Sequence, residues 1–271
     1  MERPHRYGPF LSLRKVVILF LFTIWVCQGS AEVEPRLVHV IVALADNAHQ
    51  GIVPVPEVLG NGDDPGKNLD WGAAFGVRTF LRKSSAWKEI ATVEHPNSAV
   101  LERSVFLHTA SGTYLIADAY RGREIKTAIN DFFRLASGQD LGIGEIELHG
   151  DEKNLTLPAR TDLVVYGGHD GLMDFSLEKT LQGTSAQKRE VIVLACASKG
   201  YFSTGLRPTG AQPLLWTTGL MAPEAYTLKA ALDGWIAGES AEQVRERAAM
   251  AYAKYQKISA SAAERLFSSS W

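Results

Sequence analysis

Uninterrupted apolar runs mark the predicted strands of this chain. Residues 37–45 (LVHVIVALA) are almost all β-branched or aliphatic, which is typical of a strand buried on both faces of a parallel sheet. Shorter runs predict further strands at residues 163–166, 191–195 and 214–217. Segments at residues 105–107 and 114–119 flank Ser111 and Gly112, and such a turn between two strands indicates a hairpin.

Helical spacing fills much of the sequence between these strands. It predicts helices over residues 69–83, 121–136, 223–235 and 240–257. Gly138 stands where a helix should stop, and Pro223 suits the first turn of one. Ser240 and Gln243 have the spacing of a capping box. Strands that alternate with helices predict an α/β fold, a mostly parallel sheet flanked by helices.

The N-terminal segment has the layout of an export signal. Four basic side chains lie within residues 1–15, residues 16–26 are apolar except for Thr23, and Gly29, Ser30 and Ala31 supply the small residues of a cleavage site. A mainly apolar run of 11 residues is short for a bilayer span, which needs about 20. We therefore expect residues 1–31 to be a signal peptide, with an uncleaved anchor as the alternative, and residues 32–271 to be one domain that is secreted or periplasmic.

Composition and charge narrow the function classes. The chain has 271 residues, of which 46% are hydrophobic and 21% charged, so it can form a full core. Its net charge is −2, and removal of residues 1–31 would leave 24 basic and 29 acidic side chains. Such an acidic balance argues against a nucleic-acid partner. Without residues 1–31, no long apolar stretch remains to span a membrane.

Candidate chemistry lies where two predicted strands end. His169 follows residues 163–166 within the turn GGHDG, and Cys196 comes directly after residues 191–195. If these strands are parallel neighbours, both side chains emerge at one rim of the sheet. An imidazole beside a thiol can accept its proton, which is the basis of nucleophilic catalysis. Taken singly, each residue is more often structural.

The order of these residues along the chain excludes several enzyme classes. No histidine follows Cys196, which excludes the papain order and the α/β-hydrolases, whose histidine comes last. Cys27 falls within the predicted signal, so Cys196 would be the one thiol of the exported domain and could form no internal disulfide.

The segments DLVVYGGHDG, from Asp162 to Gly171, and VIVLACASKG, from Val191 to Gly200, resemble the caspase-like clan of cysteine peptidases. This clan includes caspases, legumain, gingipains and clostripain. The resemblance implies a caspase-like fold, with Cys196 as nucleophile and His169 as general acid and base. It also implies that the backbone N–H groups of Cys196 and Asp170 bind the oxyanion. Asp170 stands where the clan usually has Gly, and the caspase pentapeptide is absent.

The same resemblance implies a peptide or protein as substrate. Residues 214–218, with Trp216 and Thr217, would be the strand edge that pairs with the peptide main chain. Asp46, which follows the first strand, is a candidate for the pocket that receives the residue before the cleaved bond. There it would favour Arg or Lys, although a loop carboxylate of this kind more often caps a turn.

Two other functions stay open. One is a catalytically inactive caspase-like domain that binds a peptide or a partner protein. The other is a metal-dependent hydrolase that uses the acidic loop from Asp63 to Asp70. The chain has no HExxH, CxxC or paired-histidine spacing, so the sequence predicts neither a metal site nor a cofactor.

Overall fold

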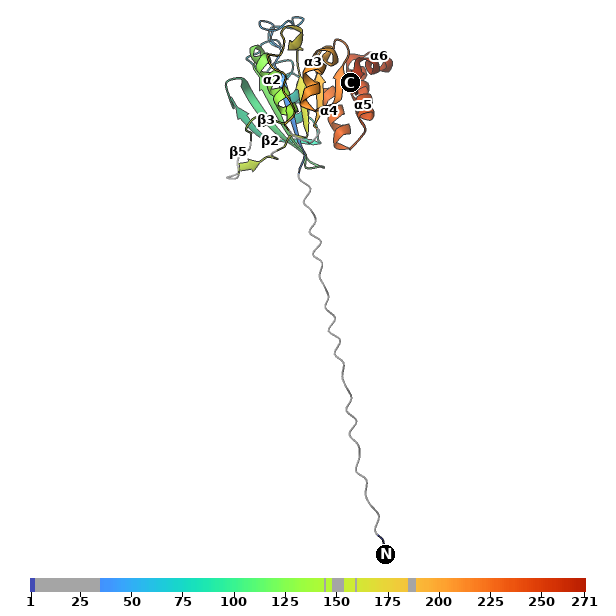
Figure 1. Cartoon of the computed structure of the whole chain (residues 1–271). Helices are drawn as coiled ribbons and strands as arrows, with labels where there is room; N and C mark the ends of the chain where they lie inside the picture. The colour runs from blue at the N-terminus through green and yellow to red at the C-terminus, as the bar shows by residue number, and fades with distance from the viewer. Residues whose placement is uncertain (3–34, 144, 148–153, 159, 185–188) are drawn as a thin grey trace. The chain divides into compact units, whose positions relative to one another are not determined.

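A computed structural model describes residues 1–2, 35–143, 145–147, 154–158, 160–184 and 189–271. The predicted signal peptide lies almost wholly outside the described residues. Residues Glu34–Trp271 form one compact unit, built on an eight-stranded sheet (Figure 1). No helix among the described residues has the length and apolar character needed to cross a membrane.

The sheet is mixed, with a parallel centre and antiparallel margins. Its strand order is β10-β9-β8-β7-β1-β4-β3-β2, and the strands from β9 to β4 are parallel to one another. A separate two-stranded ribbon joins β5 and β6. The strands are β1 Leu37–Ala43, β2 Trp87–Glu94, β3 Val100–His108, β4 Tyr114–Tyr120, β5 Glu145–Glu147, β6 Asn154–Thr156, β7 Leu163–Gly167, β8 Glu190–Leu194, β9 Gln212–Thr217 and β10 Phe267–Ser268. The predicted α/β fold with a mostly parallel sheet is confirmed, in an arrangement consistent with a caspase-like fold.

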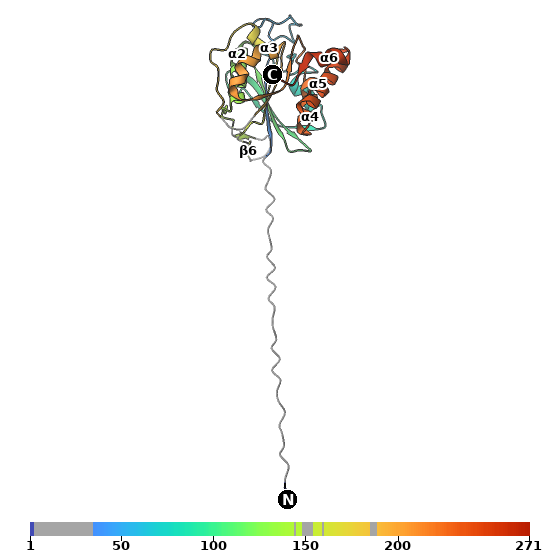
Figure 2. The ribbon, with the colours of Figure 1, turned by 45° about the vertical axis from the view of Figure 1, so that its right-hand side comes forward.

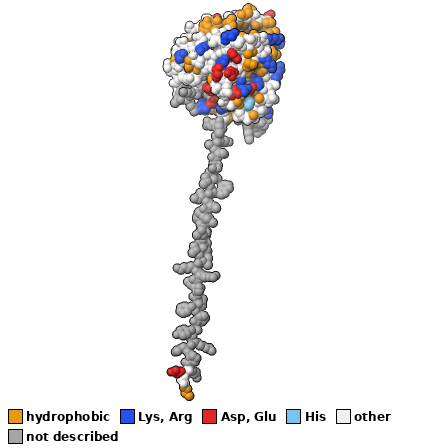
Figure 3. All heavy atoms as spheres, turned by 90° about the vertical axis from the view of Figure 1, so that its right-hand side faces the viewer, with side chains coloured by type: hydrophobic (Ala, Val, Ile, Leu, Met, Phe, Trp, Pro, Cys, Tyr) orange, Lys and Arg blue, Asp and Glu red, His pale blue; other side chains and the backbone are white. Residues whose placement is uncertain are grey.

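Helices cover both faces of the sheet. They are α1 Val77–Arg82, α2 Ile125–Ser137, α3 Ser198–Leu206, α4 Ala225–Ile236, α5 Ala241–Gln256 and α6 Ala260–Leu266. Figure 2 shows α2 and α3 on one side of the sheet and α4 to α6 on the other. The outer side with α4 to α6 mixes acidic, basic and apolar side chains (Figure 3).

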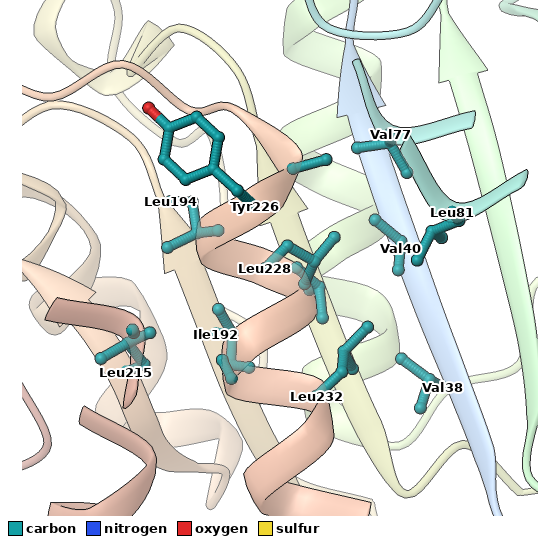
Figure 4. Packing of buried hydrophobic residues seen from close by; sticks show 14 of the residues in the cluster. Val38, Val40, Val77, Leu81, Ile192, Leu194, Leu215, Tyr226, Leu228 and Leu232 are labelled. Carbon is teal, nitrogen blue, oxygen red and sulfur yellow. The ribbon is translucent and has the colours of Figure 1, made fainter. Parts of the chain in front are cut away.

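The alternation of side chains along β1 separates the two largest clusters of the core. Val38 and Val40 contribute to the cluster that packs against α1, α4 and α5 (Figure 4). Ile41 and Ala43 belong to the cluster on the side of α2 and α3. All of β1 is buried, which explains why its sequence reads as a continuous apolar run. This central strand holds both halves of the core together.

Most predicted elements are confirmed, and their ends differ in places. Gly138 terminates α2 with φ 94°, and the capping box of Ser240 and Gln243 begins α5 with both of its hydrogen bonds present. The helix predicted over residues 69–83 is wrong in its first half, since α1 begins only at Val77. A Cβ on Gly72 would lie 2.1 Å from the Gly66 carbonyl oxygen, so this segment packs as turns against its own loop.

Candidate functional site

His169 lies just beyond β7, in a turn fixed by its backbone. The Tyr166 hydroxyl donates a hydrogen bond of 2.7 Å to the His169 carbonyl oxygen. Gly168 has φ 132°, and a Cβ there would come within 2.6 Å of the Ala43 carbonyl oxygen. Only glycine therefore fits the close approach of this turn to β1. The turn sets the direction in which the imidazole leaves the sheet.

The imidazole of His169 is held by a carboxylate that follows it in the chain. Its Nε2 lies 2.7 Å from Oδ2 of Asp174. The same carboxylate accepts a bond of 3.3 Å from the Gly51 N–H, in the loop after β1. Because Asp174 is 44% exposed and His169 only 9%, the pair lies at the boundary between the protein and the solvent. With Nε2 bound to Asp174, Nδ1 is the nitrogen left for another partner.

Cys196 lies in the turn between β8 and α3. Ala197, the residue after it, has the left-handed conformation (φ 48°, ψ 29°), which is uncommon and costly for a residue with a side chain. Its N–H is tied to the Gly219 carbonyl oxygen at 2.8 Å. The Sγ atom of Cys196 lies 3.4 Å from the Met221 nitrogen and 3.5 Å from the Met221 oxygen. Because α3 begins at Ser198, the thiol lies near the N-terminal end of this helix, where negative charge is favoured.

The structure brings His169 and Cys196 into one cavity. The strands β7 and β8 are parallel neighbours, so the predicted juxtaposition at one rim is confirmed. Both residues line a cavity of about 560 Å³, a size suited to a side chain or a small ligand. No hydrogen bond joins them among the described residues. The cavity is walled by the loop after β1, the turns after β7 and β8, the segment before α4, and the end of α5.

The mouth of the cavity is apolar and exposed. Val53 and Leu220 are among its lining residues and are 86% and 76% exposed, and Met173 is 43% exposed. Exposed apolar side chains gathered at one opening are typical of surfaces that bind a ligand or partner. A polypeptide that entered the cavity would cover them.

The two predicted oxyanion donors follow the ends of neighbouring parallel strands, Asp170 after β7 and Cys196 after β8. Within the described part of the chain, neither the N–H of Cys196 nor that of Asp170 donates a hydrogen bond. The Asp170 side chain is fully buried; its Oδ1 accepts from the Leu172 N–H at 3.0 Å, while its Oδ2 has no partner among the described residues. Burial raises the pKa of Asp170 to about 7.

Three predicted substrate-binding residues lie elsewhere. The carboxylate of Asp46 turns into its own loop, where it accepts hydrogen bonds from the N–H groups of Ala48 and His49 and contacts the His49 ring. Asp46 does not line the cavity. Trp216 and Thr217 are fully buried, and β10 is paired with them at the edge of β9. The expected edge for a peptide is therefore already occupied at these two positions.

Two carboxyl groups that the sequence did not single out as substrate-binding line the cavity instead. Asp70 follows the loop after β1, and Glu224 immediately precedes α4. Burial, and then the nearby charge of Glu224, raise the pKa of Asp70 to about 7. The sequence placed Asp70 only in an acidic loop, and nothing local distinguishes Glu224. Their approach depends on how two distant loops fold together.

The acidic loop offers little to a metal ion. Asp63, one of its carboxylates, forms ion pairs of 2.5 Å with Arg121 and 2.8 Å with Arg123. In the part of the chain that the structure describes, no group of three or more His, Cys, Asp or Glu side chains is placed to hold a metal. The geometry therefore gives the metal-dependent alternative no support.

Comparisons with known proteins leave the family open. No family model matches the chain, and no curated protein or solved structure matches it significantly.

Proposed function

We propose that this chain is a cysteine endopeptidase or a related amide hydrolase that uses Cys196 and His169. One observation carries the proposal: a thiol and an imidazole follow two neighbouring parallel strands and line the same cavity. The resemblance of the flanking segments to caspase-like peptidases supports the same assignment of roles. So does the position of Cys196 in a strained turn at a helix N-terminus.

The arrangement suggests a two-step acyl transfer. In the first step His169 accepts the thiol proton, and the thiolate attacks the carbonyl carbon of the substrate. The C–N bond then breaks as the imidazolium returns the proton to the leaving amine, which gives a thioester on Cys196. In the second step water attacks this thioester, with His169 taking the water proton and returning it to the thiolate. The peptide acid and the free thiol result.

Two further groups support this chemistry. Asp174, bound to Nε2 of His169, directs Nδ1 to the thiol and stabilises the imidazolium that forms. The N–H groups of Cys196 and Asp170, which donate no hydrogen bond within the described chain, are the donors for the oxyanion. In a ligand-free site the thiol and imidazole need not be hydrogen-bonded, because such contacts often tighten only with substrate present.

The test combines thiol reactivity with turnover. The full chain is treated with iodoacetamide at pH 7, modification of Cys196 is followed by mass spectrometry, and a library of fluorogenic peptides is screened in parallel. We expect Cys196 to react faster than a free-thiol standard and at least one peptide to be cleaved. Cys196→Ala should abolish cleavage, and His169→Ala should slow both alkylation and turnover. His108→Ala, in the distant hairpin, is the matched control. Cleavage that persists in Cys196→Ala would refute the mechanism.

A non-catalytic binding domain is the second candidate. It is favoured by the contacts of the Cys196 sulfur with both backbone polar atoms of Met221 and by the missing bond to His169. In that case Cys196 would react no faster than the standard, no peptide would be cleaved, and the cavity would still bind a peptide. The alkylation rate separates the two functions.

Export is part of the proposal. The pattern of residues 1–31 supports cleavage after Ala31 and a secreted or periplasmic protein. Expression of the full chain with its own N-terminus, followed by sequencing of the exported product, should give Glu32 as the first residue. A product that keeps residues 1–31 and sediments with membranes would instead indicate an anchor.

A further inference from the structure

Among the described residues, the cavity is lined by two carboxyl groups and by no Lys or Arg that could balance them. Asp70 and Glu224 both line it, and its remaining titratable lining side chains are those of His169, Cys196 and Tyr252. Neither carboxyl group takes part in an ion pair within the described residues. Buried carboxyl groups such as that of Asp70 are normally paired, yet the described residues supply no counter-charge to either group.

Asp70 is the clearer case of a carboxyl group without a full set of partners among the described residues. The residue is 4% exposed, and its Oδ1 has no hydrogen-bond partner among the described residues. Its backbone, by contrast, is well held: its N–H donates to the Asn68 side chain at 3.1 Å, and its carbonyl oxygen accepts from Val77 at 2.9 Å. The backbone therefore fixes a buried carboxyl group in the cavity wall, and Oδ1 of this group has no partner among the described residues. Unsatisfied buried groups of this kind call for an explanation, and function is one of them.

Glu224 is held by its neighbours on α4 and α5. Its Oε2 accepts hydrogen bonds from the Tyr226 hydroxyl at 2.6 Å and from the Gln256 amide at 3.0 Å. The ring of Tyr226 stacks on Tyr255 with a centroid separation of 4.2 Å. These contacts use one carboxylate oxygen; Oε1 makes no hydrogen bond within the described chain. The group is thus oriented and keeps an acceptor free.

We propose that Asp70 and Glu224 form a subsite for a cationic side chain, so that the peptide cleaved at Cys196 carries Lys or Arg in the cavity. As a substrate subsite, this inference rests on the proposed function. An ammonium or guanidinium group would neutralise the carboxyl pair and donate the hydrogen bonds that it lacks. An acidic side chain would be repelled, and a neutral one would leave the pair unsatisfied. The sequence anticipated a basic preference from Asp46; the geometry assigns it to different residues.

Binding of benzamidine tests the subsite without requiring catalysis. Benzamidine carries a cationic amidinium group, and benzamide is its neutral counterpart of similar shape. Calorimetry on the full chain should show benzamidine binding at least tenfold more tightly than benzamide. Asp70→Asn and Glu224→Gln should each weaken benzamidine at least fivefold, with the fold checked by circular dichroism. Glu246→Gln removes an exposed carboxylate of α5 outside the cavity and should change nothing.

The outcomes separate this inference from the proposed function. Equal binding of benzamidine and benzamide overturns the subsite, even if Cys196 is alkylated rapidly. Selective benzamidine binding by a protein whose Cys196 reacts slowly keeps the cation site and refutes the peptidase. When both hold, benzamidine should protect Cys196 from iodoacetamide, and peptides with Arg should be cleaved at least tenfold faster than peptides with neutral citrulline in its place. Equal cleavage of the two peptides would remove the subsite from substrate recognition.

Discussion

Buried carboxyl groups give this molecule its clearest properties at the scale of single residues. Asp70 and Asp170 both have a pKa raised to about 7, with burial as the main cause in each. An acid whose pKa is higher in the folded state binds more protons when folded, so its contribution to stability falls as the pH rises between the two values. Asp70 lies in the cavity wall and Asp170 follows His169 in the chain, and shifted carboxyl groups of this kind often cluster at functional sites.

Asp70→Asn should make the protein less sensitive to pH. A pKa raised from 3.8 to about 7 corresponds to at most about 4 kcal/mol, lost as the pH rises from about 4 to 7. The variant lacks this loss. Relative to wild type, its free energy of unfolding should therefore rise by one to a few kcal/mol (about 4 at most) between pH 4 and pH 8. Urea unfolding at the two pH values measures the change, and a constant difference between variant and wild type would contradict it.

Asp174→Asn should impair His169 without unfolding the protein. The substitution keeps the shape of the side chain but removes the charge that stabilises the imidazolium. We expect turnover to fall by at least about tenfold and the pH profile of Cys196 alkylation to shift. Glu178→Gln removes an exposed carboxylate that pairs with Lys126 in the same connection and serves as control. Equal profiles for Asp174→Asn and wild type would show that the contact is only structural.

At the scale of elements, the hydrophobic pattern of the sequence predicted the strands whose burial follows from their own residues. The apolar runs of β1, β7 and β8 predicted strands correctly, because both faces of each strand are covered and its side chains are buried. The strand β2 was missed because it is a margin strand with mixed burial. His169 and Cys196 could be found because residues that follow parallel strands meet at one rim. The partners of these two residues, Asp174 and the Asp70–Glu224 pair, depend on loop packing that no local pattern encodes.

The capping box of α5 provides a test at this scale. The Ser240 side chain accepts a hydrogen bond from the Gln243 N–H, and the Gln243 side-chain oxygen accepts one from the Ser240 N–H. Ser240→Ala removes the first bond and should lower the free energy of unfolding by about 1 kcal/mol. Ser261→Ala, inside α6 and exposed, should cost less. Since α5 supplies Tyr252 and Gln256 to the cavity, similar benzamidine binding by both variants would show that the cap affects stability alone.

At the scale of the whole molecule, β1 contributes to the two large core clusters, one on each face of the sheet that carries the site. Trp71 belongs to the cluster beside α1, α4 and α5, and Trp216 to the cluster beside α2 and α3. Because β1 contributes buried side chains to both clusters, neither can open without exposing part of the other. We therefore expect a single cooperative transition, as is usual for one compact domain.

Urea unfolding monitored on each side of the sheet should reveal that coupling. The chain has six tryptophans, so a variant that keeps Trp71 and has Phe at the other five positions reports one cluster. The corresponding variant that keeps only Trp216 reports the other. In both variants the fluorescence midpoint should coincide with the midpoint for loss of secondary structure by circular dichroism. Ile41→Ala, in the middle of β1 and fully buried, should lower the stability by about 2–5 kcal/mol and move both reporters together. A midpoint that shifts only for Trp216 would mean that the two sides unfold separately. The two faces of the sheet would then be separate unfolding units, and the walls of the site would belong to different units.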